Sequence, residues 1–423
     1  MAPDPHTQAD AAHRPDALAQ TTAGAPVAGF LRRELPIAFL ARTTVNTPFR
    51  IIYPFLPSIA RGLGISVMAA GGLTSLRFIA GLAAPLLGPL ADRYARRRVM
   101  EVALLLLAVA SLVLGSAGTF AAAAIAFAIY GLAKALYDPA VHGYLGEAVS
   151  YQKRSRAVGL LELSWSCALL FGGPIAGILI ERFGWRAPWA VLLVLGLAGL
   201  GLTRAGLPLA PPRRAHADDK QSAVTLAAAV GTTWRDLLRR RSVVALLITA
   251  VLLTLAIEVP FIMYGEWLEA TFGLSLTSLG IASIVVGLAE ATAELGSAAL
   301  TDRLGKRRSV LAGLLGLAAS LIALPYLARL GLVAALAGVA LMMLTFEFGL
   351  VSLLPLATEL ATDARSTLFS LTLMAFSLSR ILGALIGGWL WQWQSIALHA
   401  SVGAACALAA AAVLALGIRE IQT

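Results

Sequence analysis

Apolar runs of about 20 residues recur along most of this chain, and each is long enough to span the hydrocarbon core of a bilayer. Charged residues make up 13% of the sequence, and soluble domains carry about twice that fraction. Backbone polar groups in lipid are satisfied only in helices and closed barrels, and these runs lack the alternation of barrel strands. The sequence therefore predicts an all-α polytopic membrane protein with twelve transmembrane helices. The expected spans lie near residues 34–60, 66–91, 99–118, 120–147, 156–181, 186–205, 242–268, 275–300, 309–328, 331–359, 366–391 and 395–417.

An acidic and basic signature occurs twice, at equivalent places in the two halves of the chain. Its first copy reads GPLADRYARRR over residues 88–98, and its second reads AALTDRLGKRR over residues 298–308. The offset from Asp92 to Asp302 equals the offset from Gly173 to Gly383. Two independent features at one offset indicate a duplicated unit, and duplicated halves in a membrane protein are typical of transporters that rock around a central site.

The first copy of the signature resembles the loop pattern G-x-L-a-D-r-x-G-r-r of the major facilitator superfamily. Ala95 stands where that pattern has a glycine; the second copy has Gly305 there, but Ala298 where the first glycine is expected. Together with the span number and the duplication, the resemblance covers about residues 30–420. It implies two pseudo-symmetric six-helix bundles, a central cavity and alternating access, without indicating a subfamily. The matching residues are Gly88, Leu90, Ala91, Asp92, Arg93, Arg96 and Arg97.

The resemblance also implies that the aspartate of this loop helps to latch the bundles at the cytoplasmic side. A carboxylate there can accept hydrogen bonds from a neighbouring helix N-terminus or pair with arginine. The alternative is a plain basic anchor, which we favour for Arg97, Arg98 and Arg308. We favour the gate for Asp92 with Arg93, because a carboxylate adds nothing to such an anchor. The candidate gate residues are Gly88, Asp92, Arg93, Arg96, Arg97, Asp302, Arg303, Gly305 and Arg307.

The span pattern divides the chain into five segments. We expect a disordered cytoplasmic tail (1–29), a first six-helix bundle (30–205), a linker (206–241), a second six-helix bundle (242–417) and a short cytoplasmic tail (418–423). The linker opens with a proline-rich stretch, and its part 222–241 could form an amphipathic helix on the inner membrane surface.

Lysine and arginine are concentrated on one side of the expected membrane, in residues 93–98, 153–156, 204–241 and 303–308. The positive-inside rule places this side, with both termini, in the cytoplasm. The net charge of +10 is then a matter of topology, and no nucleic-acid binding is expected because the basic residues lie in short loops. We expect a monomer in the lipid bilayer of a plasma membrane, the inner membrane of a bacterium.

Ionisable side chains within the spans form the candidate substrate and proton pathway. Such a side chain costs about 2.5–3.5 kcal/mol at the bilayer centre on insertion scales, so its presence indicates a cavity or a partner. The first half carries mostly cations and the second half mostly carboxylates, so a substrate could insert between the two signs. The candidates are Arg42, Asn46, Arg50, Arg77, Lys134, Asp138, Glu162, Glu258, Glu290, Glu294, Glu347 and Arg380.

Spacing within this set suggests which side chains meet. Arg42, Asn46 and Arg50 are spaced i, i+4, i+8 and share one helix face. Lys134 and Asp138 are one turn apart and can pair with each other. A purely structural pairing remains the alternative for these two residues and for Arg380.

Glu290 and Glu294, one turn apart, are the leading candidates for proton coupling. Two neighbouring carboxylates repel each other when both are ionised, so one of them should hold a proton at neutral pH. Arg50 or Arg77 from the facing half could then pair with the ionised carboxylate and drive proton release. Glu266 and Glu269 lie at the outer mouth and are expected to be solvated. The alternative coupling acids are Glu258, Glu347, Asp138 and Glu162.

Other classes of chemistry find little support in the sequence. It contains no Walker A pattern for nucleotide phosphates, and Cys167 and Cys406 lie singly in apolar runs. The five histidines are scattered, so no metal site is expected. We therefore expect no cofactor, no metal and no catalytic residues.

The expected function is proton-coupled secondary transport of a small organic solute, exported from the cell. Export is favoured by residues 172–177, which are similar to the Gly-Pro motif of drug/proton antiporters but lack its upstream glycines. Uptake of an organic anion or a sugar is the alternative. It is indicated by the deep arginines and by Glu147 with Arg154, a spacing similar to that of sugar porters. A membrane-embedded lipid-modifying enzyme, with His142 as a lone candidate, is the alternative from another class.

Overall fold

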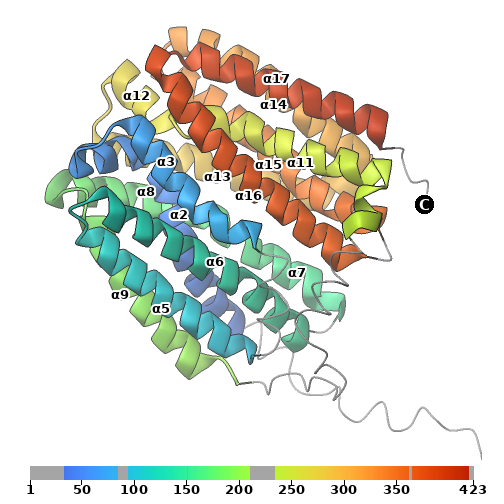
Figure 1. Ribbon diagram of the computed structural model, residues 1–423, viewed down its shortest axis with the longest axis horizontal. Coiled ribbons are helices and arrows are strands. Elements are labelled where there is room, and N and C mark those ends of the chain that lie inside the picture. Colours follow the sequence, from blue (N-terminus) through green and yellow to red (C-terminus); the bar gives the residue numbers. More distant parts are fainter. Residues whose placement is uncertain (1–32, 84–93, 150, 210–233, 362–363, 419–423) are drawn as a thin grey trace, which may run out of the picture.

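The computed structural model describes residues 33–83, 94–149, 151–209, 234–361 and 364–418, and all of its long elements are helices. Figure 1 shows them running roughly side by side along the longest axis. The helices are α2 (Leu35–Leu63), α3 (Val67–Leu82), α5 (Arg96–Gly115), α6 (Phe120–Ala148), α7 (Tyr151–Glu162), α8 (Ser164–Phe183), α9 (Ala187–Gly206), α11 (Arg241–Phe261), α12 (Tyr264–Phe272), α13 (Leu276–Leu304), α14 (Lys306–Arg329), α15 (Leu332–Leu360), α16 (Arg365–Leu390) and α17 (Ile396–Gly417), with a short 3₁₀ turn at Trp391–Trp393.

Ten helical segments among the described residues are long and apolar enough to cross a membrane. The pair α2 and α3 passes the same test together, and its two helices meet at a bend of 117°. This bend turns the chain back, so α2 and α3 counted separately complete the twelve expected helices. The amphipathic helix expected over 222–241 lies largely outside the described residues.

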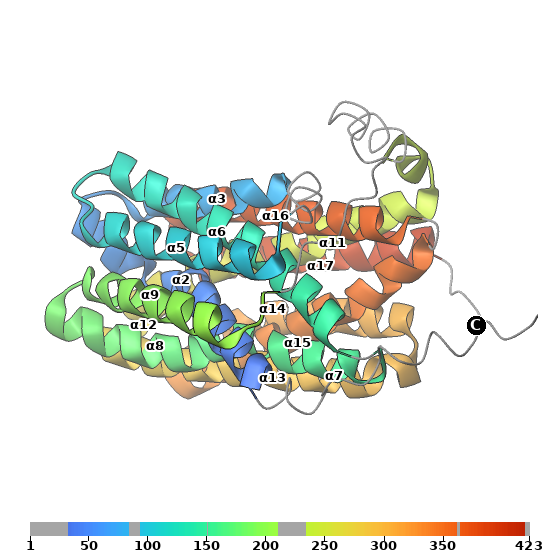
Figure 2. The ribbon, with the colours of Figure 1, turned by 90° about the horizontal axis from the view of Figure 1, so that it is seen from below.

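The helices form two groups (Figures 1 and 2). In the first, α5 packs on α6 and α9, and α2 packs on α8; in the second, α14 packs on α15 and α17, and α11 on α16 and α17. The two groups meet through α8 against α13 and α3 against α16. Under the sequence repeat, α8 corresponds to α16 and α3 corresponds to α13. The repeat therefore relates the α8–α13 contact to the α3–α16 contact.

The repeat also preserves the turn after the first span of each half. Gly64 and Gly273 end α2 and α12 in the left-handed conformation, with φ of 66° and 64°. Such a conformation favours glycine because a Cβ atom would be strained there. Two residues later, Ser66 and Ser275 cap α3 and α13 through their side chains.

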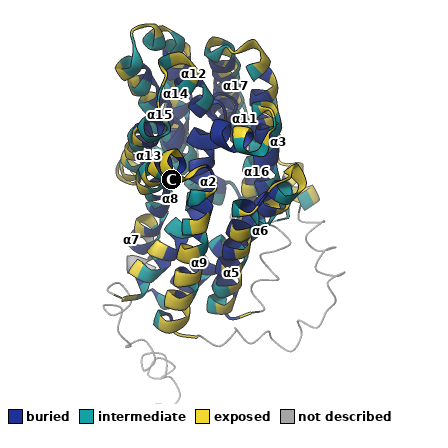
Figure 3. Ribbon diagram, turned by 90° about the vertical axis from the view of Figure 1, so that its left-hand side faces the viewer, coloured by how far each residue is buried: buried dark blue, intermediate teal, exposed yellow. Residues whose placement is uncertain are grey.

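Burial follows the arrangement expected of a helical membrane protein. Figure 3 shows buried residues where helices face one another and exposed residues around the perimeter. Large apolar side chains are exposed on that perimeter, including Phe171, Ile175 and Leu295. In a membrane, this apolar surface is covered by lipid.

Candidate functional site

The signature residues that the structure describes lie at one end of the bundle, the right-hand end in Figure 1, here called the basic end. Arg96 Nε pairs with Glu147 Oε1 at 3.4 Å, and Lys306 pairs with Glu359 at the equivalent place in the second group. Arg97 donates to the carbonyl of Leu207 at 2.8 Å. The two copies therefore make matching contacts, each within its own six-helix group.

The remaining gate candidates are placed less fully. Gly88, Asp92 and Arg93 lie outside the described residues. Asp302 and Arg303 are exposed at the end of α13, and the described part of the chain gives them no ion pair. Gly305 joins α13 to α14 with a φ of 88°. Arg307 donates to the carbonyl of Ala415 at 3.0 Å. In the first half, Arg97 likewise donates to a backbone carbonyl, that of Leu207.

A connected polar cluster joins α2, α6 and the end of α7 within the first group. Arg42 contacts Asp138 at 3.3 Å and Glu162 at 3.1 Å. Lys134 lies 2.8 Å from Asp138 and donates to Asn46 Oδ1 at 2.5 Å. The predicted pairing of Lys134 with Asp138 is therefore present, and Arg42 and Asn46 lie on the common face that their spacing indicates.

Exposure along α6 rises toward the basic end. The side chains of Lys134, Asp138 and His142, one turn apart, are 20%, 27% and 36% exposed. Glu162, which pairs with His142 at 3.3 Å, is 43% exposed. Charged groups facing lipid would be costly, and this cluster contacts α2 instead. The gradient therefore indicates that water reaches the cluster from the basic end.

One ion pair crosses between the two groups in the middle of the bundle. Arg50 Nη2 on α2 lies 2.5 Å from Glu290 Oε2 on α13, and the two side chains are 3% and 1% exposed. The Arg50 guanidinium also lies 4.7 Å from the centre of the Trp165 ring, an arrangement typical of cation–π contacts. The sequence predicts that Arg50 could pair with a carboxylate of Glu290 or Glu294, and in the structure its partner is Glu290.

Two further carboxylates lie beside this ion pair. Glu294 follows Glu290 by one turn of α13, and Glu347 on α15 is close enough for its charge to interact with both. The Oε2 atoms of Glu294 and Glu347 are buried and have no hydrogen-bond partner among the described residues. Three carboxylates thus lie near one guanidinium, which is paired with Glu290, so a proton or a bound cation could compensate the remaining negative charge.

A second polar contact between the groups lies nearer the end that carries α12. Tyr53 on α2 donates to Glu258 on α11 at 2.8 Å, and Arg380 on α16 donates to Glu258 at 3.0 Å. Arg77 lies against the rings of Tyr53 and Phe78 at 4.8 and 4.9 Å. Arg77 also donates to the carbonyls of Phe49 and Thr74. The sequence predicts that Arg77 could pair with an ionised carboxylate of the facing half. In this structure it instead contacts aromatic rings and backbone carbonyls of its own group.

The end opposite the basic end, here called the α12 end, is held together across the two groups. Arg61 on α2 pairs with Glu269 on α12 at 2.9 Å. Glu181 at the end of α8 accepts a hydrogen bond from the backbone N–H of Thr277, in the first turn of α13, at 2.6 Å. The expectation that Glu269 is simply solvated is thus wrong, because a cation from the other group lies against it.

Small residues let the two groups approach closely near the same end. A Cβ atom on Gly177 of α8 would lie 2.5 Å from the carbonyl oxygen of Leu276, and one on Gly173 would lie 2.7 Å from Ser283 Cβ. In the second group, Gly383 and Gly387 pack instead against α11. These glycines permit close helix packing, and the first pair does so between the groups.

We expect Gly177→Leu to hold the α12 end open, because the new side chain cannot fit against α13. Spin labels at Phe183 and Leu330, exposed residues of the two groups at this end, should report a longer distance by pulsed electron resonance. Gly201→Leu is the matched control, since a Cβ there meets nothing within 4 Å. An unchanged distance in the Gly177 variant would contradict this account of the closure.

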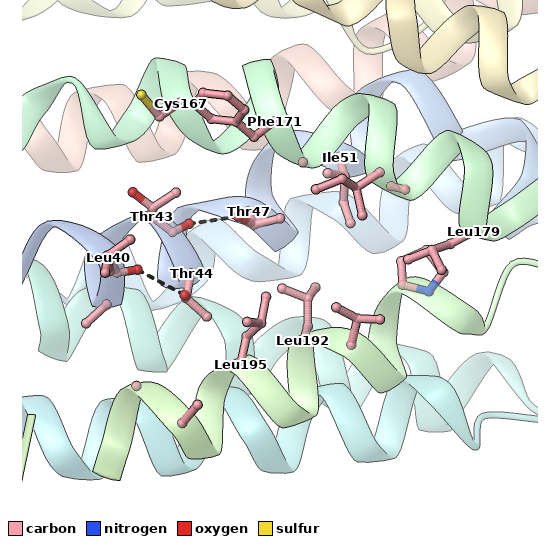
Figure 4. A pocket seen from close by; sticks show the side chains of 18 of the residues that line it. Leu40, Thr43, Thr44, Thr47, Ile51, Cys167, Phe171, Leu179, Leu192 and Leu195 are labelled. Atoms are coloured by element: carbon pink, nitrogen blue, oxygen red, sulfur yellow. Dashed lines mark hydrogen bonds between the residues drawn. The ribbon is translucent and has the colours of Figure 1, made fainter. Parts of the chain in front are cut away.

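A pocket of about 370 Å³ lies away from these charges, between α2, α8 and α9 (Figure 4). Its lining is almost wholly apolar, with Phe171 and Leu192 on opposite helices. The hydroxyls of Thr44 and Thr47 donate to carbonyls of their own helix, as the dashed lines of Figure 4 mark, so they offer no free donor to a ligand. We assign the solute site to the charged region instead.

Sequence reasoning missed several contacts of the charged region. Ser164 receives hydrogen bonds from Arg42 and Asn46, and no spacing rule indicates a serine of a distant helix. His142 was noted only as a lone histidine, although it follows Asp138 by one turn of α6 and so shares the face of the cluster. That spacing could have placed it there. Among the described residues, no cluster of histidine, cysteine or carboxylate suits a metal ion.

Asp138 connects two cations, so its removal should weaken the first group. We expect Asp138→Asn to lower the free energy of unfolding by about 1–3 kcal/mol, because Arg42 and Lys134 lose a charged acceptor. Denaturation of the purified protein in detergent measures the change. The control is His142→Gln, which leaves Glu162 its contact with Arg42. Equal stability of the Asp138 variant and the wild type would show that the cluster does not support the fold.

Comparison with known proteins gives consistent results. A sequence model of the Major Facilitator Superfamily matches residues 38–266 and 246–421. The uncharacterized MFS-type transporter YceJ of Bacillus subtilis (strain 168) is 25% identical over 355 residues, which cover 84% of this chain and 88% of that protein. The tetracycline resistance protein, class C, of Escherichia coli is 24% identical over 284 residues, covering 66% and 70%. The crystal structure of a D-xylose-proton symporter superposes with a TM-score of 0.75 at 17% identity, covering 92% of this chain and 98% of that one.

Proposed function

The chain belongs to the major facilitator superfamily of membrane transporters, and on this premise we propose that it couples proton flow to the export of a small organic solute. Secondary transport of a small molecule across a membrane follows from the family; the proton, the direction and the residues are our proposal. The observation that carries it is the buried Arg50–Glu290 pair, beside which one buried oxygen each of Glu294 and Glu347 has no hydrogen-bond partner among the described residues.

Alternating access requires contacts that exist in one state and break in another. The two groups are tied at the α12 end by the Arg61–Glu269 pair and by Glu181 on α13. Polar side chains become more exposed toward the basic end. This arrangement supports a state that is closed at the α12 end and accessible from the basic end.

The proton-binding acids in this proposal are Glu294 and Glu347. The charges of Glu290 on its own helix, of Glu162 on α7 and of Arg50 on α2 act on Glu294. The charges of Glu290, Glu294, Arg50 and of Arg380 on α16 act on Glu347. Arg50 is already paired with Glu290, so burial of an unpaired charge is avoided if the other two carboxylates hold protons.

Export is the direction we propose. It is supported by the partial Gly-Pro motif at 172–177 and by the similarity to a tetracycline resistance protein. For uptake of an organic anion, Arg42 and Arg50 are both paired with carboxylates, whereas the buried Nη2 atom of Arg77 has no hydrogen-bond partner among the described residues. A flux assay in proteoliposomes with an imposed pH gradient, run over a panel of solutes, tests the proposed function. The absence of any proton-driven flux across the panel would reject it.

The proposed topology places the basic end and both termini in the cytoplasm of a bacterial cell, following the positive-inside rule. In a variant lacking Cys167 and Cys406, single cysteines at the basic positions should not react with a membrane-impermeant reagent added outside sealed cells, whereas a cysteine at Leu330, exposed at the α12 end, should react. Reaction at any basic position would reverse or refute the topology. The basic positions are Arg93, Arg98, Lys153, Arg214 and Arg308.

A further inference from the structure

We propose that His399 is a proton-binding site whose charged form holds the corner between α16 and α17, here called the α16–α17 corner (residues 387–399). Figure 1 shows these two helices meeting at the α12 end. The site lies wholly within the second group. Neither Glu294 nor Glu347 takes part in it, so it is separate from the acids of the proposed proton coupling.

The backbone of the α16–α17 corner adopts an uncommon conformation. α16 ends at Leu390, a 3₁₀ turn covers Trp391–Trp393, and α17 begins at Ile396. Gln394 has a φ of 46° and is the one residue other than glycine with a positive φ in the described chain. A residue with a side chain persists in this conformation only when the surrounding structure fixes it. The corner therefore depends on contacts that hold it.

His399 supplies two of these contacts. It lies in the first turn of α17 and is fully buried, with 0% of its surface exposed. Its Nδ1 atom lies 2.8 Å from the carbonyl oxygen of Ser395, which precedes α17. Its Nε2 atom lies 2.9 Å from the carbonyl oxygen of Gly387, in the last turn of α16. The imidazole thus joins the two sides of the corner.

The two acceptors determine which form of the imidazole suits the site. A carbonyl oxygen accepts hydrogen bonds and cannot donate them, whereas a neutral imidazole has one N–H and one nitrogen that only accepts. In the neutral form, one ring nitrogen of His399 would direct its lone pair at a carbonyl oxygen within 2.9 Å. The imidazolium has an N–H on both nitrogens and can donate to both carbonyls.

An aromatic ring also lies beside the imidazole. The ring centre of Trp391 is 5.5 Å from that of His399, and the two planes meet at 66°. An indole ring within about 6 Å attracts a positive charge. Trp391 belongs to the 3₁₀ turn itself, so this attraction also acts on the corner.

The charged groups of the neighbouring helices are engaged with one another. α11, α14 and α16 pack against α17. Glu258 of α11 binds Arg380 of α16, and Arg329 of α14 lies against the ring of Tyr326. Within the described chain, His399 forms no ion pair with these groups. The proton on the imidazole is therefore held by carbonyl oxygens alone and exchanges with the solution at the α12 end.

The sign of the pH effect follows from these contacts. Imidazole is the side chain that changes its charge between about pH 5 and about pH 8. In acid, His399 donates to both carbonyls and the corner is firm. As the pH rises, the proton is lost, one of the two hydrogen bonds is lost with it, and the corner loosens.

The part of α16 that His399 holds also faces the first group. A Cβ atom on Gly388, the residue after Gly387, would lie 3.4 Å from the carbonyl oxygen of Met68 on α3. His399 thus positions the turn of α16 that packs on α3. Acid at the α12 end makes this turn firmer.

NMR of the full-length protein in detergent, labelled with nitrogen-15 at its five histidines, tests the protonation state. The His399 signals are those absent from His399→Gln. If that variant does not fold, Trp391→Phe identifies them by their shift, because it changes the ring beside the imidazole. We expect both ring nitrogens to carry protons at about pH 5 and only one at about pH 9. A ring in the same protonation state at both pH values overturns the proposal.

Hydrogen exchange of the backbone over residues 391–395 tests the effect on the corner. After correction for the intrinsic exchange rate, we expect exchange in the wild type to be about tenfold faster at about pH 8 than at about pH 6. His399→Gln should exchange fast at both pH values, and His142→Gln, which changes a histidine near the basic end, should respond as the wild type does. A His399 variant that keeps the wild-type response would show that another group controls the corner and would overturn the proposal.

Discussion

Replacing Arg50 by methionine should lower the free energy of unfolding by about 3–5 kcal/mol and abolish transport. Arg50 and Glu290 are almost fully buried and tie α2 of the first group to α13 of the second. Methionine leaves the Glu290 carboxylate buried without its cation, beside two further carboxylates. Chemical denaturation in detergent measures the loss of stability, and solute flux in proteoliposomes measures the loss of function.

The double variant Arg50→Met with Glu290→Met separates stability from function. Removing both charges together restores most of the stability, because no uncompensated charge remains. Transport should stay lost, because the proposed mechanism requires the charged contact between α2 and α13. The matched control is Arg61→Met, which breaks the exposed pair with Glu269 and should cost less than about 1 kcal/mol. A double variant that transports normally would reduce the Arg50–Glu290 pair to a structural contact.

Glu294→Gln and Glu347→Gln should each reduce proton-driven accumulation of solute to the level of passive equilibration. Glutamine keeps the size of the side chain but can neither bind nor release a proton, so the gradient can no longer be used at that position. Accumulation in proteoliposomes with an imposed pH gradient measures the effect, and Glu101→Gln is the control. If both variants accumulate solute as the wild type does, the coupling acid must be sought at Asp138, Glu162 or Glu258.

The sequence was sufficient for the architecture, because hydrophobic length and the positions of charges follow from insertion into a bilayer. Run length alone located the last span closely, expected near 395–417 and found at Ile396–Gly417. The spans expected near 156–181 and 242–268 are each made of two helices, a break that run length did not predict. The repeat that relates Asp92 to Asp302 is seen again in the matching contacts of Arg96 with Glu147 and Lys306 with Glu359.

The exact partners within the site could be predicted only where they share one helix. Lys134 and Asp138 pair as their spacing indicates. Glu290 and Glu294 also share a helix face, but the partner of each carboxylate comes from helices elsewhere in the chain. Arg50 pairs with one of them and leaves the other without a cation. Which of the two would be paired could not be predicted, because it depends on how the two groups pack.

The most direct test of the proposed proton coupling, in which protons on Glu294 and Glu347 stabilise the state closed at the α12 end, needs no solute. Spin labels at Phe183 and Leu330 report the distance between the two groups at that end, and the measurement is repeated between about pH 5 and about pH 9. In the closed state one oxygen of each carboxylate is buried without a partner among the described residues, and a proton on each removes the cost of that burial. Acid should therefore stabilise the closed α12 end, and alkali should shift the wild type toward longer distances. The Glu294→Gln, Glu347→Gln double variant should keep the short distance throughout. A wild-type distance that does not change with pH, or a double variant that responds as the wild type does, would contradict the account.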